Sequence, residues 1–182
     1  MGNLLRAEDT VLFVIDVQDK LVGMLKNSDE ISKNNVVLVK TAKTLGVPLV
    51  VTEQYPKGLG QTIPDIAEHI DADSVFEKTS FSALEDDNIK SYLTGLGRKN
   101  IVLTGIETHI CVYQTALVLL DAGYNVYVVK NATSSRKSKD YKTALELMRD
   151  FGVRLTCVET ILFELLRSSK HPNFKEIQAL IK

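Results

Sequence analysis

The sequence contains few cysteines: only Cys111 and Cys157 occur in 182 residues. Two cysteines do not make the disulfide framework that stabilises small secreted domains, so we expect a reducing, cytoplasmic compartment. Neither sign of charge is in excess, with 22 basic and 23 acidic residues, so no electrostatic signature of nucleic acid or an anionic membrane is present. No apolar run is long enough to span a membrane, and we expect no signal peptide.

Several catalytic signatures are also missing. The turn DVQDKLVG, residues 16–23, contains no glycine-rich phosphate loop, and the chain has no G-x-x-x-x-G-K-[ST] motif. It also has no G-x-S-x-G nucleophile elbow. The three histidines, His69, His109 and His171, show no metal-ligand spacing, so we expect structural or surface roles for them. These absences argue against dinucleotide binding, a P-loop and a serine nucleophile on such an elbow.

What is present is an alternation of short apolar runs with longer helical patterns. The runs are continuously apolar, which is typical of strands buried on both faces of a parallel sheet; they cover residues 10–16, 47–54, 73–78, 100–105, 125–131 and 153–159. The helical patterns lie near residues 28–45, 85–96, 109–122, 139–151 and 159–167, with a last one from about 172. The alternation predicts a single α/β domain over residues 1–182, with three α/β/α layers and a six-stranded parallel sheet in the order 3-2-1-4-5-6.

Three residues with reactive side chains follow the strands of this sheet. Ligands of such sheets bind beyond the carboxyl ends of the strands, where the strand order reverses. In the expected order the first and fourth strands are neighbours there, so Asp16, after the first strand, faces Cys111, just beyond the fourth. Lys78 ends the third strand and approaches from the side. The topology therefore predicts that Asp16, Lys78 and Cys111 share one crevice.

Each of these residues also has an ordinary structural interpretation. A lone cysteine is more often a small buried apolar residue than a nucleophile. Thr108 is a candidate helix N-cap, however, which would place Cys111 in the first helical turn, where the helix dipole favours a thiolate. Asp16 is either a cap or turn residue or the base for the thiol. Lys78 is either a solvated surface lysine or the ion-pair partner that keeps Asp16 charged and stabilises a thiolate.

Two further residues are expected to have no catalytic role. Cys157 has apolar neighbours in the last strand pattern and is interpreted as a core residue. His109 is only two residues from Cys111, but side chains at that spacing on a helix point to different faces. Direct proton transfer between His109 and the thiol is therefore not expected.

With these residues in place, the chain resembles the isochorismatase-like cysteine hydrolase superfamily, which includes nicotinamidases, N-carbamoylsarcosine amidohydrolases and isochorismatases. The matching stretches are VLFVIDVQ, FEKTSFSAL and GIETHICV, in that order, and the likeness covers nearly the whole chain. The resemblance implies that Asp16, Lys78 and Cys111 are the catalytic residues. It also implies a cis peptide bond between Ile106 and Glu107, which would aim the amides of Glu107 and Cys111 at one point as an oxyanion hole.

The chain departs from the family pattern in two places. Nicotinamidases carry an Asp/His metal cluster after the second strand, whereas the stretch TEQYPKGLGQT here contains no histidine, so neither a metal nor a cofactor is expected. This stretch and the C-terminal ILFELLRSSKHPNFKEIQALIK resemble instead a subgroup of isochorismatase-domain proteins with poorly defined substrates. The family often has an acidic residue before the alanine near the end of strand five, where this chain has Asn131 and the sequence gives no role for it.

The resemblance predicts a small-molecule cysteine hydrolase that cleaves a carbon–nitrogen bond of an amide, carbamoyl or ureido compound through a thioester. We expect the substrate to contact Gln18, Gln54, Tyr55 and Phe81. Two alternatives stay open: vinyl-ether hydrolysis of the isochorismatase type, which needs no thiol, and a non-catalytic oligomeric scaffold or thiol redox sensor. The expected partners are the substrate and further copies of the chain in a homo-oligomer, with the apolar C-terminal segment FKEIQALIK as a candidate interface.

Overall fold

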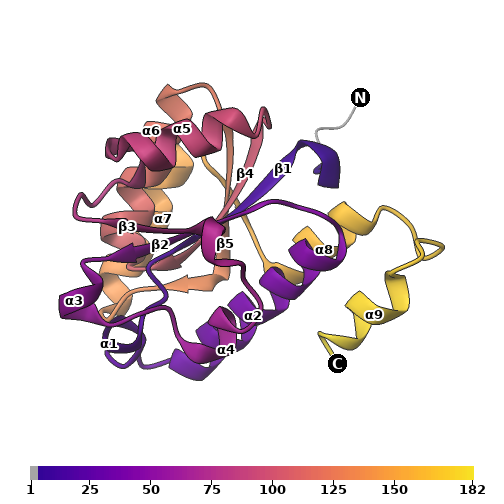
Figure 1. The fold of residues 1–182 in the computed structure, drawn as a ribbon, viewed down its shortest axis with the longest axis horizontal. Coiled ribbons are helices and arrows are strands. Elements are labelled where there is room, and N and C mark those ends of the chain that lie inside the picture. The colour runs from indigo at the N-terminus through magenta and orange to yellow at the C-terminus, as the bar shows by residue number, and fades with distance from the viewer. Residues whose placement is uncertain (1–3) are drawn as a thin grey trace.

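The computed structural model describes residues 4–182, and its centre is a parallel sheet. Six strands lie in the order β3-β2-β1-β4-β5-β6, all of them parallel (Figure 1). The predicted fold class and strand order are therefore confirmed. The strands are β1 (Thr10–Ile15), β2 (Leu49–Gln54), β3 (Val75–Lys78), β4 (Asn100–Ile106), β5 (Asn125–Ser134) and β6 (Arg154–Thr156).

Helices follow the strands and cover both faces of the sheet. The longer ones are α2 (Ser28–Thr44), α5 (Asp87–Gly95), α6 (Tyr113–Asp121), α7 (Ser138–Asp150) and α8 (Val158–Leu166). The shorter ones are α1 (Asp19–Val22), α3 (Pro56–Leu59), α4 (Pro64–Ala67) and α9 (Phe174–Ala179). Figure 1 shows α5, α6 and α7 on one side of the sheet and α2 and α8 on the other. Between residues 4 and 182, no helix combines the length and the apolar character that crossing a membrane requires.

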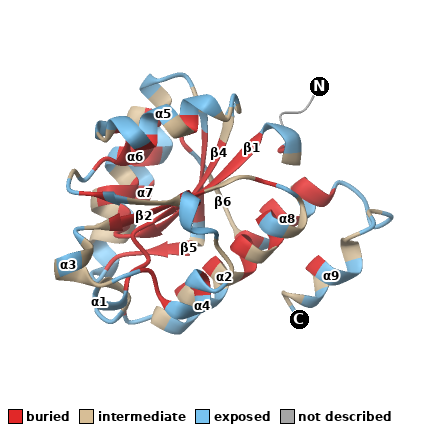
Figure 2. Ribbon diagram, viewed as in Figure 1, coloured by how far each residue is buried: buried red, intermediate tan, exposed pale blue. Residues whose placement is uncertain are grey.

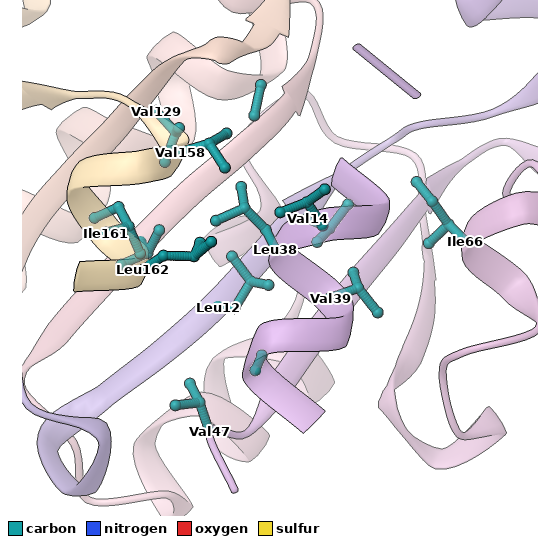
Figure 3. Packing of buried hydrophobic residues seen from close by; sticks show 14 of the residues in the cluster. Leu12, Val14, Leu38, Val39, Val47, Ile66, Val129, Val158, Ile161 and Leu162 are labelled. Carbon is teal, nitrogen blue, oxygen red and sulfur yellow. The ribbon is translucent and has the colours of Figure 1, made fainter. Parts of the chain in front are cut away.

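The β1 strand explains why the apolar runs are continuous. All six of its residues are buried, and Figure 2 shows the same burial along its neighbours. Leu12 and Val14 belong to the apolar cluster that includes Leu38 of α2 and residues of α8 (Figure 3). Phe13 and Ile15 belong to the cluster on the opposite face. Successive side chains of a strand point to opposite faces, and here both faces are covered by helices.

The C-terminal helix packs onto its own chain. Ile177 of α9 is fully buried in the same cluster as α2 and α8, and the rings of Phe163 and Phe174 lie 6.3 Å apart. Thr44 at the end of α2 donates a hydrogen bond to Glu176 over 3.0 Å. Part of the apolar face of the segment FKEIQALIK is therefore used within the chain, and its role in a subunit interface stays a prediction.

One glycine controls how closely β4 ends beside β1. Gly105 has a φ angle of +113°, and a Cβ atom there would lie 1.9 Å from the carbonyl oxygen of Ile15. Any residue with a side chain would push the two strands apart. The glycine thus allows the turn that follows β4 to lie directly beside the end of β1, where Asp16 begins.

Candidate active site

Asp16 and Lys78 form a buried ion pair at the carboxyl ends of β1 and β3. Oδ2 of Asp16 lies 2.8 Å from Nζ of Lys78, and both side chains have an exposed fraction of 0%. The other carboxylate oxygen, Oδ1, accepts a hydrogen bond of 2.7 Å from the hydroxyl of Thr52 on β2. Apart from the ionic contact, Oδ2 has no conventional hydrogen-bond donor among the described residues. One lone pair of the carboxylate therefore remains able to accept a proton.

The ammonium group of Lys78 is held by neighbours other than Asp16. It donates to Oε1 of Gln54 at 2.6 Å and to the carbonyl oxygens of Ser80 and Phe81 at 3.1 and 3.4 Å. The side-chain Nε2 of Gln54 in turn donates to the carbonyl of Thr79 over 2.8 Å. Gln54 thus fixes the position of Lys78, a role that depends on strand pairing and that its place in the sequence does not reveal.

Cys111 lies in an unusual turn between β4 and α6. The peptide bond between Ile106 and Glu107 is cis, at the position that the family resemblance implies. The turn Thr108–Val112 is π-helical, so the expected α-helical first turn is wrong. Thr108 is not the N-cap either, because its hydroxyl pairs with that of Thr133 at 2.8 Å, inside the fold.

The thiol is buried and shares its surroundings with the ion pair. Burial, with an exposed fraction of 7%, is the main reason why the pKa of Cys111 rises from 9.0 to about 12. The negative charge of Asp16 raises this pKa further, while Lys78 lowers it, and hydrogen bonding to both side chains also contributes. The three residues predicted from the topology therefore meet at one place. The thiol is protonated at neutral pH, contrary to the expected thiolate, because loss of hydration outweighs the partial charge of a helix end.

Glu107 and His109, which precede the cysteine in the same turn, contact the segment that follows β5. The buried carboxylate of Glu107 accepts the backbone N–H of Arg136 at 3.0 Å and lies 3.7 Å from its guanidinium Nε. The ring nitrogen Nδ1 of His109 is 2.9 Å from the hydroxyl of Ser135, and Nε2 is 3.9 Å from Asp140. Both side chains thus connect the turn to the end of β5 and the start of α7.

The residues expected to contact the substrate fall into two groups. Gln18 is fully buried; its Nε2 donates to the carbonyls of Gln54 and Gly60 at 3.1 and 2.6 Å, and its Oε1 accepts the N–H of Gln54 at 2.7 Å. Gln18 is therefore better described as a structural residue than as a substrate ligand. Tyr55 and Phe81 are 56% and 54% exposed, and both border the segments that hold Lys78. The substrate contact of these two aromatic residues stays a prediction.

Cys157 is not the core residue that its apolar neighbours predict. Strand β6 ends at Thr156, and Cys157 is the half-buried residue that precedes helix α8, with its sulfur 3.1 Å from the hydroxyl of Thr160. Asn131 also acquires a role, since its Oδ1 accepts the N–H of Val158 at 3.0 Å and caps α8 from the neighbouring strand.

The donor set for a metal ion is sparse. Over residues 4–182, no group of three or more His, Cys, Asp or Glu side chains is arranged so that it could hold a metal ion. The stretch after β2 instead uses Glu53, whose carboxylate accepts both the backbone N–H and the hydroxyl of Thr62 at 2.7 and 2.8 Å. Glu53 therefore joins the end of β2 to Thr62 and fixes the loop between them.

Known proteins share both the sequence and the fold. The isochorismatase domain matches residues 10–160. Isochorismatase domain-containing protein 1 from Salmo salar is 40% identical over 182 residues; the match covers the whole chain but only 64% of that relative, so the chain spans less than two thirds of its length. A Phytophthora sojae protein described as the secreted isochorismatase effector Isc1 is 41% identical over 186 residues, covering 100% of this chain and 88% of the relative.

A solved structure agrees with these sequence matches. The structure described as the MAR1 ribonuclease from Caenorhabditis elegans superposes with a TM-score of 0.92 and 39% sequence identity, over 98% of this chain and 92% of that one. Most of the chain thus matches the isochorismatase domain, and its fold matches that of a relative with substantial sequence identity. The chain therefore belongs to the isochorismatase-domain family.

Proposed function

We propose that the protein is a cysteine hydrolase that cleaves a carbon–nitrogen bond of a small amide, carbamoyl or ureido compound. The observation that carries this proposal is the convergence of a thiol, a carboxylate and an ammonium group from three distant parts of the chain. Lys78 lies 2.8 Å from Asp16, and both charges act on the pKa of Cys111. A nucleophile beside a base that is itself held by a third group is the arrangement that covalent hydrolysis requires.

The first half of the reaction forms a thioester. Sγ of Cys111 attacks the substrate carbonyl carbon while Oδ2 of Asp16 accepts the thiol proton, so the thiolate develops as the carbon–sulfur bond forms. The high pKa of the free thiol makes this coupling necessary. Negative charge moves to the carbonyl oxygen, which the backbone amides of Glu107 and Cys111 stabilise as an oxyanion hole. Asp16 then returns the proton to the leaving nitrogen, and the carbon–nitrogen bond breaks.

The second half of the reaction restores the enzyme. A water molecule attacks the thioester carbon, and Asp16 accepts its proton. The carbon–sulfur bond breaks, the acid product leaves, and the sulfur of Cys111 takes a proton back. Lys78 stays against the carboxylate throughout and keeps Oδ2 directed at the thiol, since its ammonium is fixed by Gln54 and by the carbonyls of residues 80 and 81.

The burial of the site favours a small reacting group. Asp16 and Lys78 have no exposed side-chain surface and Cys111 has little, so the scissile group must enter a narrow space. A terminal carboxamide, carbamoyl or ureido group has the required size. The exposed rings of Tyr55 and Phe81 supply apolar contact for the rest of the substrate at the rim.

The test measures ammonia release from a panel of small amides, carbamates and ureides. We expect at least one compound to be hydrolysed, with activity lost by a factor of about 10³ or more in Cys111→Ala. Cys157→Ala is the matched control, because it removes the other thiol of the chain, and it should retain full activity. Unchanged ammonia release in Cys111→Ala would exclude the thioester. Isochorismate cleavage that survives in Cys111→Ala would instead support the vinyl-ether reaction.

A second candidate function is ribonuclease activity, which the description of the Caenorhabditis elegans structure favours at 39% identity. The buried ion pair argues against it, because an RNA strand would have to reach side chains without exposed surface. Incubation of the purified protein with a labelled RNA separates the two functions. RNA cleavage that disappears in Cys111→Ala, without hydrolysis of any amide, would replace the proposal above.

The assembly and the compartment also remain proposals. We expect a homo-oligomer, and because Ile177 is buried within its own chain, α9 would contribute to the interface through its other side chains. Light scattering on the purified protein measures the mass directly. One relative is described as secreted, so the expected cytoplasmic location stays a prediction.

A further inference from the structure

A polar cavity lies at the carboxyl edge of the sheet, beside β5 and the start of α8. Its volume is about 700 Å³, and Asp16, Lys78 and Cys111 are not among the residues that line it. The walls come from the segment before α2, the end of β5, one side of α7 and Cys157. The volume falls within the range of roughly 300–1,000 Å³ that is usual for small-molecule sites.

The cavity results from the unequal lengths of two neighbouring strands. Strand β5 runs from Asn125 to Ser134, whereas its pairing with β6 ends at Val129 and Thr156. The last part of β5 therefore extends beyond its outer neighbour, and the chain after β6 turns away into α8. Asn131 bonds to the first residue of α8, so a specific contact fixes the position of α8 beside β5 at this corner.

Hydroxyl groups form the floor of the cavity. Thr133, Ser134 and Ser135 line it and are all buried. The hydroxyl of Ser134 donates to Oδ1 of Asn27, another residue of the lining, at 2.8 Å. The floor is thus polar and fixed by hydrogen bonds within the fold.

Positive charge dominates the rim. Five cationic side chains line the cavity against two carboxylates, those of Glu30 and Glu146; the cations are Lys26, Lys130, Arg136, Lys142 and Arg149. Arg136 also contacts Glu107, but four cations still face the two carboxylates once it is set aside. The whole chain has a net charge of −1, so this positive potential is local. Helices α2 and α7 begin here without side-chain caps from their own N-cap residues, and the positive ends of their helix dipoles add to it.

We propose that this cavity binds a small organic anion with two or more negative charges, carried by a phosphoryl group or by paired carboxylates. The cationic rim matches anionic oxygens, and the hydroxyl floor provides further hydrogen-bond partners. A nucleic-acid strand fits less well, because the floor is recessed and Glu30 and Glu146 interrupt any continuous track of positive charge. The site is independent of the proposed hydrolysis, since its walls contain none of the three reacting residues.

Pyrophosphate and citrate are the probes, one for each source of negative charge. Binding is measured by calorimetry at low salt, with glucose as an uncharged control. Cys157 provides a second readout, because it lines the cavity and its alkylation by iodoacetamide, followed by mass spectrometry, should slow when the cavity is filled. We expect at least one probe to bind and to protect Cys157, and the preferred probe identifies the phosphoryl or the carboxylate class.

The variant Lys142→Gln/Arg149→Gln removes two rim charges on α7. Its matched control is Lys137→Gln/Lys139→Gln, which removes two exposed charges from the same part of the chain but outside the cavity. Loss of two charge-assisted contacts should weaken binding at least about tenfold, whereas the control should weaken it less than about threefold. All four residues are exposed, and thermal unfolding checks that both variants fold.

Four outcomes would overturn the proposal. These are no binding of either probe, binding without protection of Cys157, equal weakening in the two double variants, and tighter binding of a short single-stranded RNA than of both small anions. Equal weakening would indicate general attraction to a basic surface. The RNA result would assign the cavity to nucleic acid. Hydrolysis measured in the same preparations stays informative, because failure of this site leaves the proposed function untouched.

Discussion

Replacement of Asp16 by asparagine should have opposite effects on two properties of Cys111. Burial is the largest cause of its raised pKa, about 12, and the negative charge of Asp16 is the next. Asparagine keeps nearly the same shape and an acceptor for the hydroxyl of Thr52, which lies 2.7 Å from Oδ1. It removes the charge and the base, however. The thiol should therefore become easier to ionise and to alkylate, while hydrolysis should fail.

The size of the first effect follows from the charges. With a pKa of about 12, roughly one Cys111 thiol in ten thousand is ionised at pH 8. Two unit charges about 4 Å apart interact by ~4 kcal/mol at an effective dielectric constant of about 20, and a third of that energy already changes the ionised fraction about tenfold. Asp16→Asn should thus raise the alkylation rate of Cys111 at pH 8 at least about tenfold. Loss of the general base should lower hydrolysis by about 10²–10⁴.

The assay uses the Cys157→Ala background, in which Cys111 is the only thiol. Iodoacetamide incorporation is followed by mass spectrometry between about pH 6 and pH 10, and circular dichroism confirms that the variant is folded. A slower or unchanged alkylation rate in Asp16→Asn would refute the claim that the carboxylate acts on the thiol. Retained hydrolysis would show that another group accepts the proton.

Three further predictions concern pH, stability and the neighbouring histidine. Because the folded state raises the pKa of Cys111, the stabilisation by its protonated thiol is complete below the ordinary value of 9.0 and is lost as the pH rises toward about 12. Over that range the free energy of unfolding should fall by about 1 kcal/mol per pH unit more than in Cys111→Ser. Equal pH dependence of the free energy of unfolding in the two proteins would contradict this. Gln18→Leu leaves three backbone groups without a hydrogen-bond partner and should lower the free energy of unfolding, measured in urea, by about 2–4 kcal/mol. The control is Gln61→Leu at an exposed position, which should change that free energy by less than about 0.5 kcal/mol. His109→Gln should leave the pH profile of hydrolysis unchanged, since its ring contacts Ser135 at 2.9 Å, and a lost or displaced limb would make it a catalytic base.

The sheet could be predicted because its signal is strong and local. Strands such as β1 are buried on both faces, so they appear in the sequence as continuous apolar runs. Right-handed crossovers then leave few possible strand orders. The order alone brings the carboxyl ends of β1, β3 and β4 to one edge, which is why Asp16, Lys78 and Cys111 could be placed in one site before any side-chain geometry was known.

The errors arose where contacts between distant segments decide the local structure. The apolar pattern around Cys157 continues from β6 into α8 without interruption, and the boundary is set by the amide of Asn131 on another strand. Gln54 looks like a crevice residue in the sequence, but the approach of β3 turns its side chain onto Lys78. Thr108 has the residue type of a helix cap, yet its hydroxyl is taken by β5.

The burial of Cys111 also bears on the three functions that the sequence left open. A thiol that senses oxidants must be exposed and easily ionised, because the thiolate is the reactive form. Cys111 is buried with a pKa of about 12, and the negative charge of the nearby Asp16 carboxylate contributes to this high pKa. The same carboxylate is placed to accept the thiol proton when a substrate is bound. Vinyl-ether hydrolysis does not require a thiol, so it does not explain why one lies beside this carboxylate. A protonated thiol beside a buried base is inert toward solvent oxidants but can react once a carbonyl carbon is in contact with it, and this combination favours covalent hydrolysis.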